Sequence, residues 1–230
     1  MTAQPKAKMG TTAEPVEQVR HVSDEHPIVA WIQARQKTIT IAVGSILVVA
    51  LVVWYVMESS HRKRLQAMET LDQARGAMEA GDYPTASTGL QRVIQSFGGT
   101  EAAYEATLAL NQVRLLSGQA ELAVEDLQKF VATNPPEPFG SAAHSHLAMA
   151  LENSGKPAEA SAEYQKAAEA ATEDYRKIDA YLNLARTYRG QGKTQEAIDV
   201  LRDVIKRFPE QDAGTAEARV RLAELTGGGM

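Results

Sequence analysis

The chain has 230 residues, with 24 Lys and Arg against 29 Asp and Glu, which gives a formal net charge of −5. This length fits one domain with appendages, and the acidic balance argues against nucleic acid as a partner, because phosphates are bound by basic surfaces. The chain has no cysteine, which excludes disulfides, thiolate zinc sites and cysteine nucleophiles. Only 6% of the residues are aromatic, so the composition favours an all-helical protein over a β-rich one.

The first 26 residues combine Pro5, Gly10 and Pro15 with small and charged residues and show little apolar periodicity. A segment of this kind buries too little apolar surface to fold, so residues 1–26 are predicted to be a disordered tail. Residues 27–57 are predicted to contain an amphipathic lead-in followed by a transmembrane helix.

An uncharged apolar run occupies residues 39–57 and reads ITIAVGSILVVALVVWYVM. As a helix the run would be about 28 Å long, close to the ~30 Å hydrocarbon core of a bilayer. Its Ile, Leu and Val residues together favour insertion by about 3–7 kcal/mol. The alternative is a buried core helix, but such a helix seldom lacks a polar face over this length. Five residues are expected at the membrane interface: Trp31, Arg35, Lys37, Trp54 and Tyr55.

The apolar run is predicted to be an uncleaved signal anchor. It is longer than the apolar region of a typical signal peptide, begins late in the chain, and is followed by Glu58-Ser59-Ser60-His61 without a small-residue cleavage pattern. The positive-inside rule leaves the orientation open, because the basic residues on the two sides nearly balance: Arg20, Arg35 and Lys37 against Arg62, Lys63, Arg64 and Arg75.

The rest of the chain repeats with a period of 37 residues. The period is set by four glycines, each followed five residues later by an alanine and four residues after that by a bulky side chain: Gly81, Gly118, Gly155 and Gly192; Ala86, Ala123, Ala160 and Ala197; Leu90, Leu127, Tyr164 and Leu201. Each unit predicts a helix, a glycine-centred turn and a second helix, because glycine accepts the left-handed conformation that ends many helices. The alanine allows close approach of the two helices, and the bulky residue fills the space between layers.

This pattern resembles the tetratricopeptide repeat. The fourth unit carries the most signature residues: Tyr181, Leu184, Ala185, Tyr188, Ala197, Leu201, Val204 and Pro209. In the second unit, Asn111 and Arg114 replace the usual small and aromatic residues. The resemblance implies an all-α fold, in which the transmembrane helix precedes an α-solenoid of about four hairpins. The repeat domain is expected at 58–230, with units near 67–100, 104–137, 141–174 and 178–211 and a capping helix at 213–226.

The whole layout resembles the ancillary subunit of the bacterial Sec translocon, with a polar tail, one anchor, a basic stub and a small repeat domain. This resemblance implies a single-pass protein of the inner membrane, with a cytoplasmic N-terminus and a periplasmic repeat domain. Its expected role is a membrane-anchored scaffold for protein–protein interaction, with translocon subunits or periplasmic chaperones as partners. The alternative is a structural assembly factor that organises a membrane complex by self-association.

An enzyme is the least favoured reading, and no catalytic residue, metal, cofactor or small-molecule substrate is predicted. His144 and His146 are two residues apart and therefore point to different sides of a helix. The glycines of Gly190–Thr194 belong to a helix turn and lack the spacing and the preceding strand of a phosphate-binding loop.

The first helix of each hairpin is expected to line a concave groove. Positions counted from the turn glycines predict these groove residues: Leu71, Arg75, Leu108, Gln112, Ser145, Met149, Leu182 and Arg186. Arg75 and Arg186 lie three units apart, which disfavours a clamp for a terminal carboxylate. A mixed apolar groove for an extended or helical segment fits better. The alternative for the leucines is packing inside the array.

Overall fold

The computed structural model describes residues 31, 35–209 and 212–228. Contacts divide the chain into two compact units, Met1–Val56 and Met57–Met230. The described residues contain helices joined by turns and no strand. The predicted tail at 1–26 lies outside the described residues.

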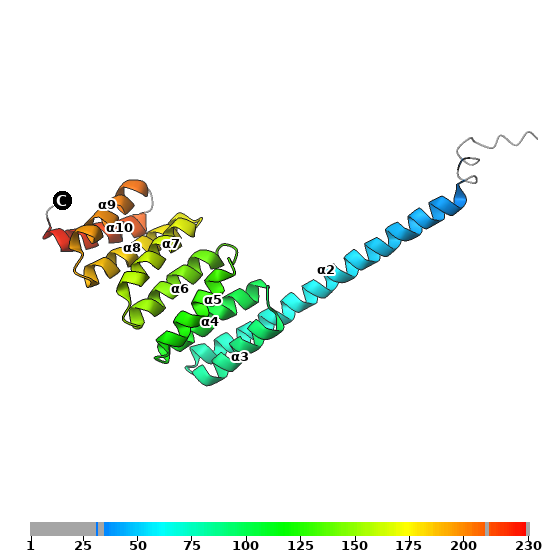
Figure 1. Ribbon diagram of the computed structural model, residues 1–230, viewed down its shortest axis with the longest axis horizontal. Helices are drawn as coiled ribbons and strands as arrows, with labels where there is room; N and C mark the ends of the chain where they lie inside the picture. Colours follow the sequence, from blue (N-terminus) through cyan, green and yellow to red (C-terminus); the bar gives the residue numbers. More distant parts are fainter. Residues whose placement is uncertain (1–30, 32–34, 210–211, 229–230) are drawn as a thin grey trace, which may run out of the picture. The chain divides into compact units, whose positions relative to one another are not determined.

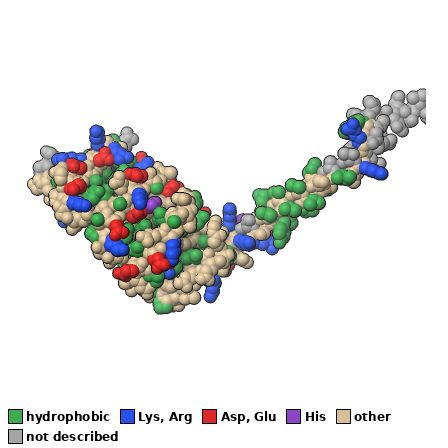
Figure 2. Space-filling view, in the orientation of Figure 1, with side chains coloured by type: hydrophobic (Ala, Val, Ile, Leu, Met, Phe, Trp, Pro, Cys, Tyr) green, Lys and Arg blue, Asp and Glu red, His purple; other side chains and the backbone are tan. Residues whose placement is uncertain are grey.

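The apolar run forms part of helix α2 (Gln36–Glu79). α2 includes a stretch that is long and apolar enough to cross a membrane, and none of that stretch is buried. Ile46 and Trp54, for example, are 67% and 63% exposed, and Figure 2 shows hydrophobic side chains along this part of the helix. A helix in a soluble core would instead be covered by other elements. Just before α2 begins, the Arg35 guanidinium lies 5.6 Å from the centre of the Trp31 ring.

The described part of the second unit consists of four helical hairpins and a closing helix (Figure 1). The first helices are the part of α2 after residue 56, α4 (Glu101–Leu116), α6 (Phe139–Asn153) and α8 (Asp174–Gly190). The second helices are α3 (Tyr83–Ser96), α5 (Ala120–Ala132), α7 (Pro157–Ala170) and α9 (Thr194–Arg207). Helix α10 (Asp212–Thr226) closes the array. The predicted all-α solenoid with its capping helix is therefore confirmed.

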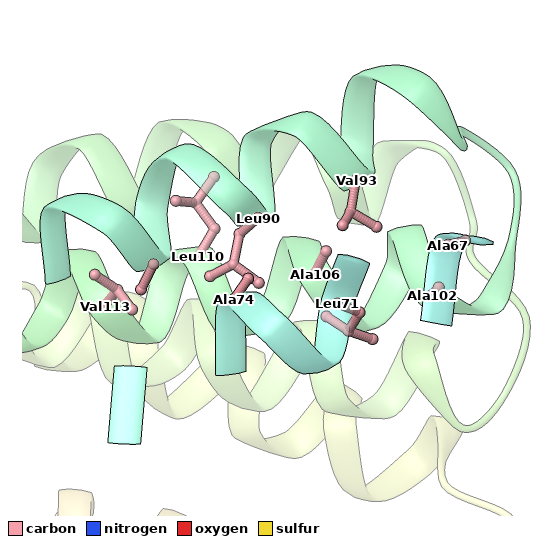
Figure 3. Packing of buried hydrophobic residues seen from close by; sticks show 10 residues of the cluster. Ala67, Leu71, Ala74, Leu90, Val93, Ala102, Ala106, Leu110 and Val113 are labelled. Atoms are coloured by element: carbon pink, nitrogen blue, oxygen red, sulfur yellow. The ribbon is translucent and has the colours of Figure 1, made fainter. Parts of the chain in front are cut away.

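Neighbouring hairpins share their hydrophobic cores. In the first cluster, Leu71 of α2 packs with Leu90 and Val93 of α3 and with Leu110 of α4 (Figure 3). The next large cluster joins α5, α6, α7 and α8, and the one after it joins α8, α9 and α10. A hairpin alone would leave one face of its core exposed, so the array is stable only because consecutive hairpins cover one another.

The four turn glycines have positive φ angles, between 73° and 76°: Gly81, Gly118, Gly155 and Gly192. A Cβ atom added at any of them would have no other heavy atom within 4 Å. Glycine is therefore favoured at these turns by the backbone conformation, and not by a lack of space for a side chain.

Replacing Gly155 with alanine is expected to lower the free energy of unfolding by about 1–2 kcal/mol, the penalty for a left-handed residue with a side chain. Gly76 is the matched control, because it lies inside α2 and also has open space around its Cβ position. Gly76→Ala should raise stability by about 0.5–1 kcal/mol, since alanine favours the helix interior. Urea denaturation followed by circular dichroism measures both. If both substitutions changed the free energy of unfolding with the same sign, the left-handed backbone conformation would not be what makes glycine necessary at position 155.

Candidate functional site

The first helices of the hairpins form one continuous surface. α4 contacts α6, α6 contacts α8, and α8 contacts α10, whereas within the described residues no second helix contacts the second helix of the next hairpin. The array therefore curves toward its first helices. We call the solvent-exposed surface of these first helices and α10 the inner face.

Several large apolar side chains are exposed on the inner face. Met68, Leu116, Met149 and Val220 are 43%, 57%, 41% and 59% exposed and lie on α2, α4, α6 and α10. Val220 borders a cleft of about 350 Å³ between α8 and α10, where Leu225 adds apolar surface. Single exposed apolar residues are common on soluble proteins. A series of them along one surface of a repeat array is typical of a site that binds another chain.

The structure separates the predicted groove residues into two groups. Leu71 and Leu182 are 0% and 4% exposed and belong to the cores, as in the alternative that they pack inside the array. The remaining six reach the surface at least in part: Arg75, Gln112, Met149 and Arg186 are exposed, and Leu108 and Ser145 are partly buried.

Ion pairs connect successive first helices across the inner face. Arg75 of α2 lies 2.6 Å from a carboxylate oxygen of Glu105 in α4, and Arg189 of α8 lies 3.3 Å from Glu224 in α10. Arg186, the other predicted cation, pairs with Glu152 of α6 at 2.7 Å. The charges of both predicted cations are thus already balanced within the protein, which further disfavours a carboxylate clamp.

Glu152 accepts hydrogen bonds from three side chains on two other helices. Besides Arg186, the Tyr164 hydroxyl donates to it at 3.1 Å and the Thr187 hydroxyl at 2.7 Å. Burial, followed by the nearby Glu152 charge, raises the pKa of the Tyr164 phenol, so this hydroxyl stays a donor. Glu152 therefore fixes α7 and α8 against α6 beneath the inner face. Glu152 is not among the residues predicted from the sequence; its signal is an acidic residue about one repeat length before a cation.

Replacing Glu152 with glutamine is expected to lower the free energy of unfolding by about 1–3 kcal/mol, because one acceptor oxygen and the charge facing Arg186 are lost. Glu125 is the control: it forms a pair with Lys129 at 2.6 Å within α5, but both side chains are more than 60% exposed. Glu125→Gln should change stability by less than about 0.5 kcal/mol. Urea denaturation of both variants makes the comparison, and equal losses would show that Glu152 has no special structural role.

The polar residues that depart from the repeat signature form a satisfied network on α4. Asn111 is fully buried; its amide donates to the Thr107 carbonyl oxygen at 2.9 Å and its side-chain oxygen accepts from Arg114 at 3.1 Å. Arg114 also forms an ion pair with Asp126 of α5. Asn111 is thus satisfied within α4, and Arg114 connects α4 to α5 through Asp126.

The two neighbouring histidines have separate surroundings. His144 Nδ1 lies 2.6 Å from Glu163 of α7, which also pairs with Lys166. Burial lowers the pKa of His146, and its Nδ1 atom is buried without a hydrogen-bond partner. Among the described residues, no group of three His, Asp or Glu side chains is arranged to hold a metal ion.

Two family models match the chain, and both describe tetratricopeptide repeats. Residues 30–175 match the family described as tetratricopeptide repeat-like domain, and residues 141–210 match the tetratricopeptide repeat. The comparison with curated proteins found no match.

Three solved structures share the fold. A Podosopora anserina putative kinesin light chain with nearly identical TPR-like repeats is 21% identical, with a TM-score of 0.59 over 73% of this chain and 87% of that one. BtubC (BKLC) from P. vanneervenii is 15% identical, with a TM-score of 0.56 over 74% and 85%. MamA is 21% identical, with a TM-score of 0.50 over 70% and 86%. With a family match that covers more than half of its length, the chain belongs to the tetratricopeptide repeat-like domain family.

Proposed function

We propose that this protein is a membrane-anchored interaction scaffold whose inner face binds a segment of another polypeptide. Tetratricopeptide repeat proteins are typically interaction scaffolds without enzymatic activity. The observation that carries the proposal is the series of exposed apolar side chains on the first helices, with Met149 near the middle. The same helices also carry ion pairs such as Arg75–Glu105, so the surface suits a segment with both apolar and polar residues.

The exposed apolar part of α2 supports a membrane anchor. It has the length of a bilayer core and is not buried within the structure. Tethering raises the local concentration of the repeat domain near other membrane proteins, so that weak contacts on the inner face suffice for docking.

The proposed setting is the bacterial inner membrane, with the N-terminus in the cytoplasm and the repeats in the periplasm. The layout that resembles the ancillary subunit of the Sec translocon supports this setting. Translocon subunits, or periplasmic chaperones that receive secreted chains, are the proposed partners.

Photo-crosslinking in intact bacteria tests the proposal. A photoreactive amino acid at Met149 is expected to crosslink the full-length protein to a translocon subunit or a chaperone. The same amino acid at Leu122, an exposed position on second helix α5, is the matched control and should give at least about tenfold less product. Met149→Asp should lower co-purification of the partner by a similar factor, because a charge is then placed against the partner's apolar surface.

The other outcomes are equally informative. Equal crosslinking at both positions would overturn the inner face as the binding surface. Crosslinks between copies of this chain would favour the self-association alternative. If the repeat domain resists protease on intact spheroplasts until the membrane is broken, the proposed orientation is wrong.

A further inference from the structure

A cleft with a basic wall lies at the first hairpin of the compact unit Met57–Met230. Its volume is about 490 Å³, and it is lined by Lys63, Arg64 and Met68 of α2 and by residues 99–102, where α4 begins. The cleft thus combines two cations with an apolar side chain, the combination expected where a lipid headgroup meets its chains.

The two cations have no acidic partner within the described structure. The preceding residue, Arg62, pairs with Glu58 at 2.8 Å, and Arg75 pairs with Glu105. Lys63 and Arg64 are exposed, and neither forms an ion pair with a described residue. Glu101, the acidic residue that lines the cleft, is itself exposed to solvent. The positive charge at this wall is therefore available to an external anion.

The position of Lys63 and Arg64 along α2 indicates which kind of anion they bind. Met57 ends the apolar run, and Lys63 follows six residues later in the same helix, which corresponds to about 9 Å along the axis. The headgroup region extends roughly 5–8 Å beyond the hydrocarbon core on each side. A Lys or Arg side chain bridges the remaining distance easily when it extends toward the bilayer.

We propose that Lys63 and Arg64 bind the phosphate groups of anionic phospholipids, with a headgroup in the cleft beside Met68. The proposal rests on the membrane anchoring proposed above. Arginine binds a phosphate through two parallel hydrogen bonds, and lysine acts as a compact point charge. Binding at this place would hold the first hairpin at the membrane surface in addition to the tether.

Calorimetric titration of the full-length protein in non-ionic detergent tests the proposal. The probes are dihexanoyl phosphatidylglycerol, dihexanoyl phosphatidylcholine and inorganic phosphate. Phosphatidylglycerol is expected to bind, and the affinity should fall about 20- to 30-fold in the double variant Lys63→Gln/Arg64→Gln, as expected for two cations near a lipid surface. Raising the salt to 0.5 M should also weaken binding, because ions screen this interaction.

The control is Arg92→Gln/Lys206→Gln, which removes two exposed cations elsewhere that also form no ion pair with a described residue. It should bind phosphatidylglycerol like the wild type. The lipid site would be overturned if the wild type bound phosphatidylcholine or inorganic phosphate as tightly as phosphatidylglycerol. It would also be overturned if the Lys63/Arg64 variant bound phosphatidylglycerol as tightly as the wild type does. Failure of the anchor would be distinguishable, since the full-length protein would then remain in aqueous buffer without detergent, whatever the titration shows.

Discussion

Replacing Leu127 with alanine is expected to lower the free energy of unfolding of the repeat unit by about 2–5 kcal/mol. Leu127 lies on α5, is 0% exposed, and packs in the cluster that contains Leu147, Leu151 and Tyr164. Removing most of its side chain leaves a cavity shared by two hairpins, which the rigid helices close only in part. Urea denaturation of the full-length protein in detergent, followed by circular dichroism, measures the loss.

Leu116→Ala is the matched control for this prediction, because Leu116 is 57% exposed on the inner face. The same chemical change at a solvated position should alter stability by no more than about 0.5 kcal/mol. If the two variants lose equal stability, Leu127 does not join the hairpins as the structure indicates. Leu116→Ala should instead weaken partner binding, so the pair of variants separates folding from docking.

Placing aspartate at Val48 and Val52 together is expected to remove the protein from the membrane fraction. Each carboxylate near the middle of a spanning helix disfavours insertion by roughly 2.5–3.5 kcal/mol, so two of them disfavour it by about 5–7 kcal/mol. This penalty offsets or exceeds the gain of about 3–7 kcal/mol that the aliphatic residues provide. Fractionation after carbonate extraction measures the distribution between membrane and supernatant.

The control for the anchor is Val48→Leu/Val52→Leu, which keeps the segment apolar and should leave the protein in the membrane fraction. The repeat unit should keep its helical circular dichroism in both variants, because Val48 and Val52 lie outside the unit that begins at Met57. Retention of the aspartate variant in the carbonate-washed membrane would contradict the anchor.

The sequence was sufficient to predict the repeat architecture, because its signals are local. The turn glycines define hairpins through a backbone conformation that other residues adopt at a penalty, and alanine and a bulky residue recur at fixed distances from each glycine. The closing helix is also predictable, since a stacked array needs a cover for its last core. The apolar run at residues 39–57 can also be recognised from the sequence, because its length and lack of charge are properties of the chain itself.

The tertiary structure decided which of these residues remain available to a partner. Leu71, Leu108 and Leu182 occupy equivalent repeat positions, yet Leu71 and Leu182 are buried and Leu108 is only partly covered. Exposure at such a position depends on how the neighbouring hairpin packs against it, which the periodicity does not encode. The pairing of Glu152 with Arg186 likewise requires α6 and α8 to lie side by side. Local backbone preferences and hydrophobic periodicity therefore determine the solenoid, whereas its binding surface results from contacts between residues one repeat apart.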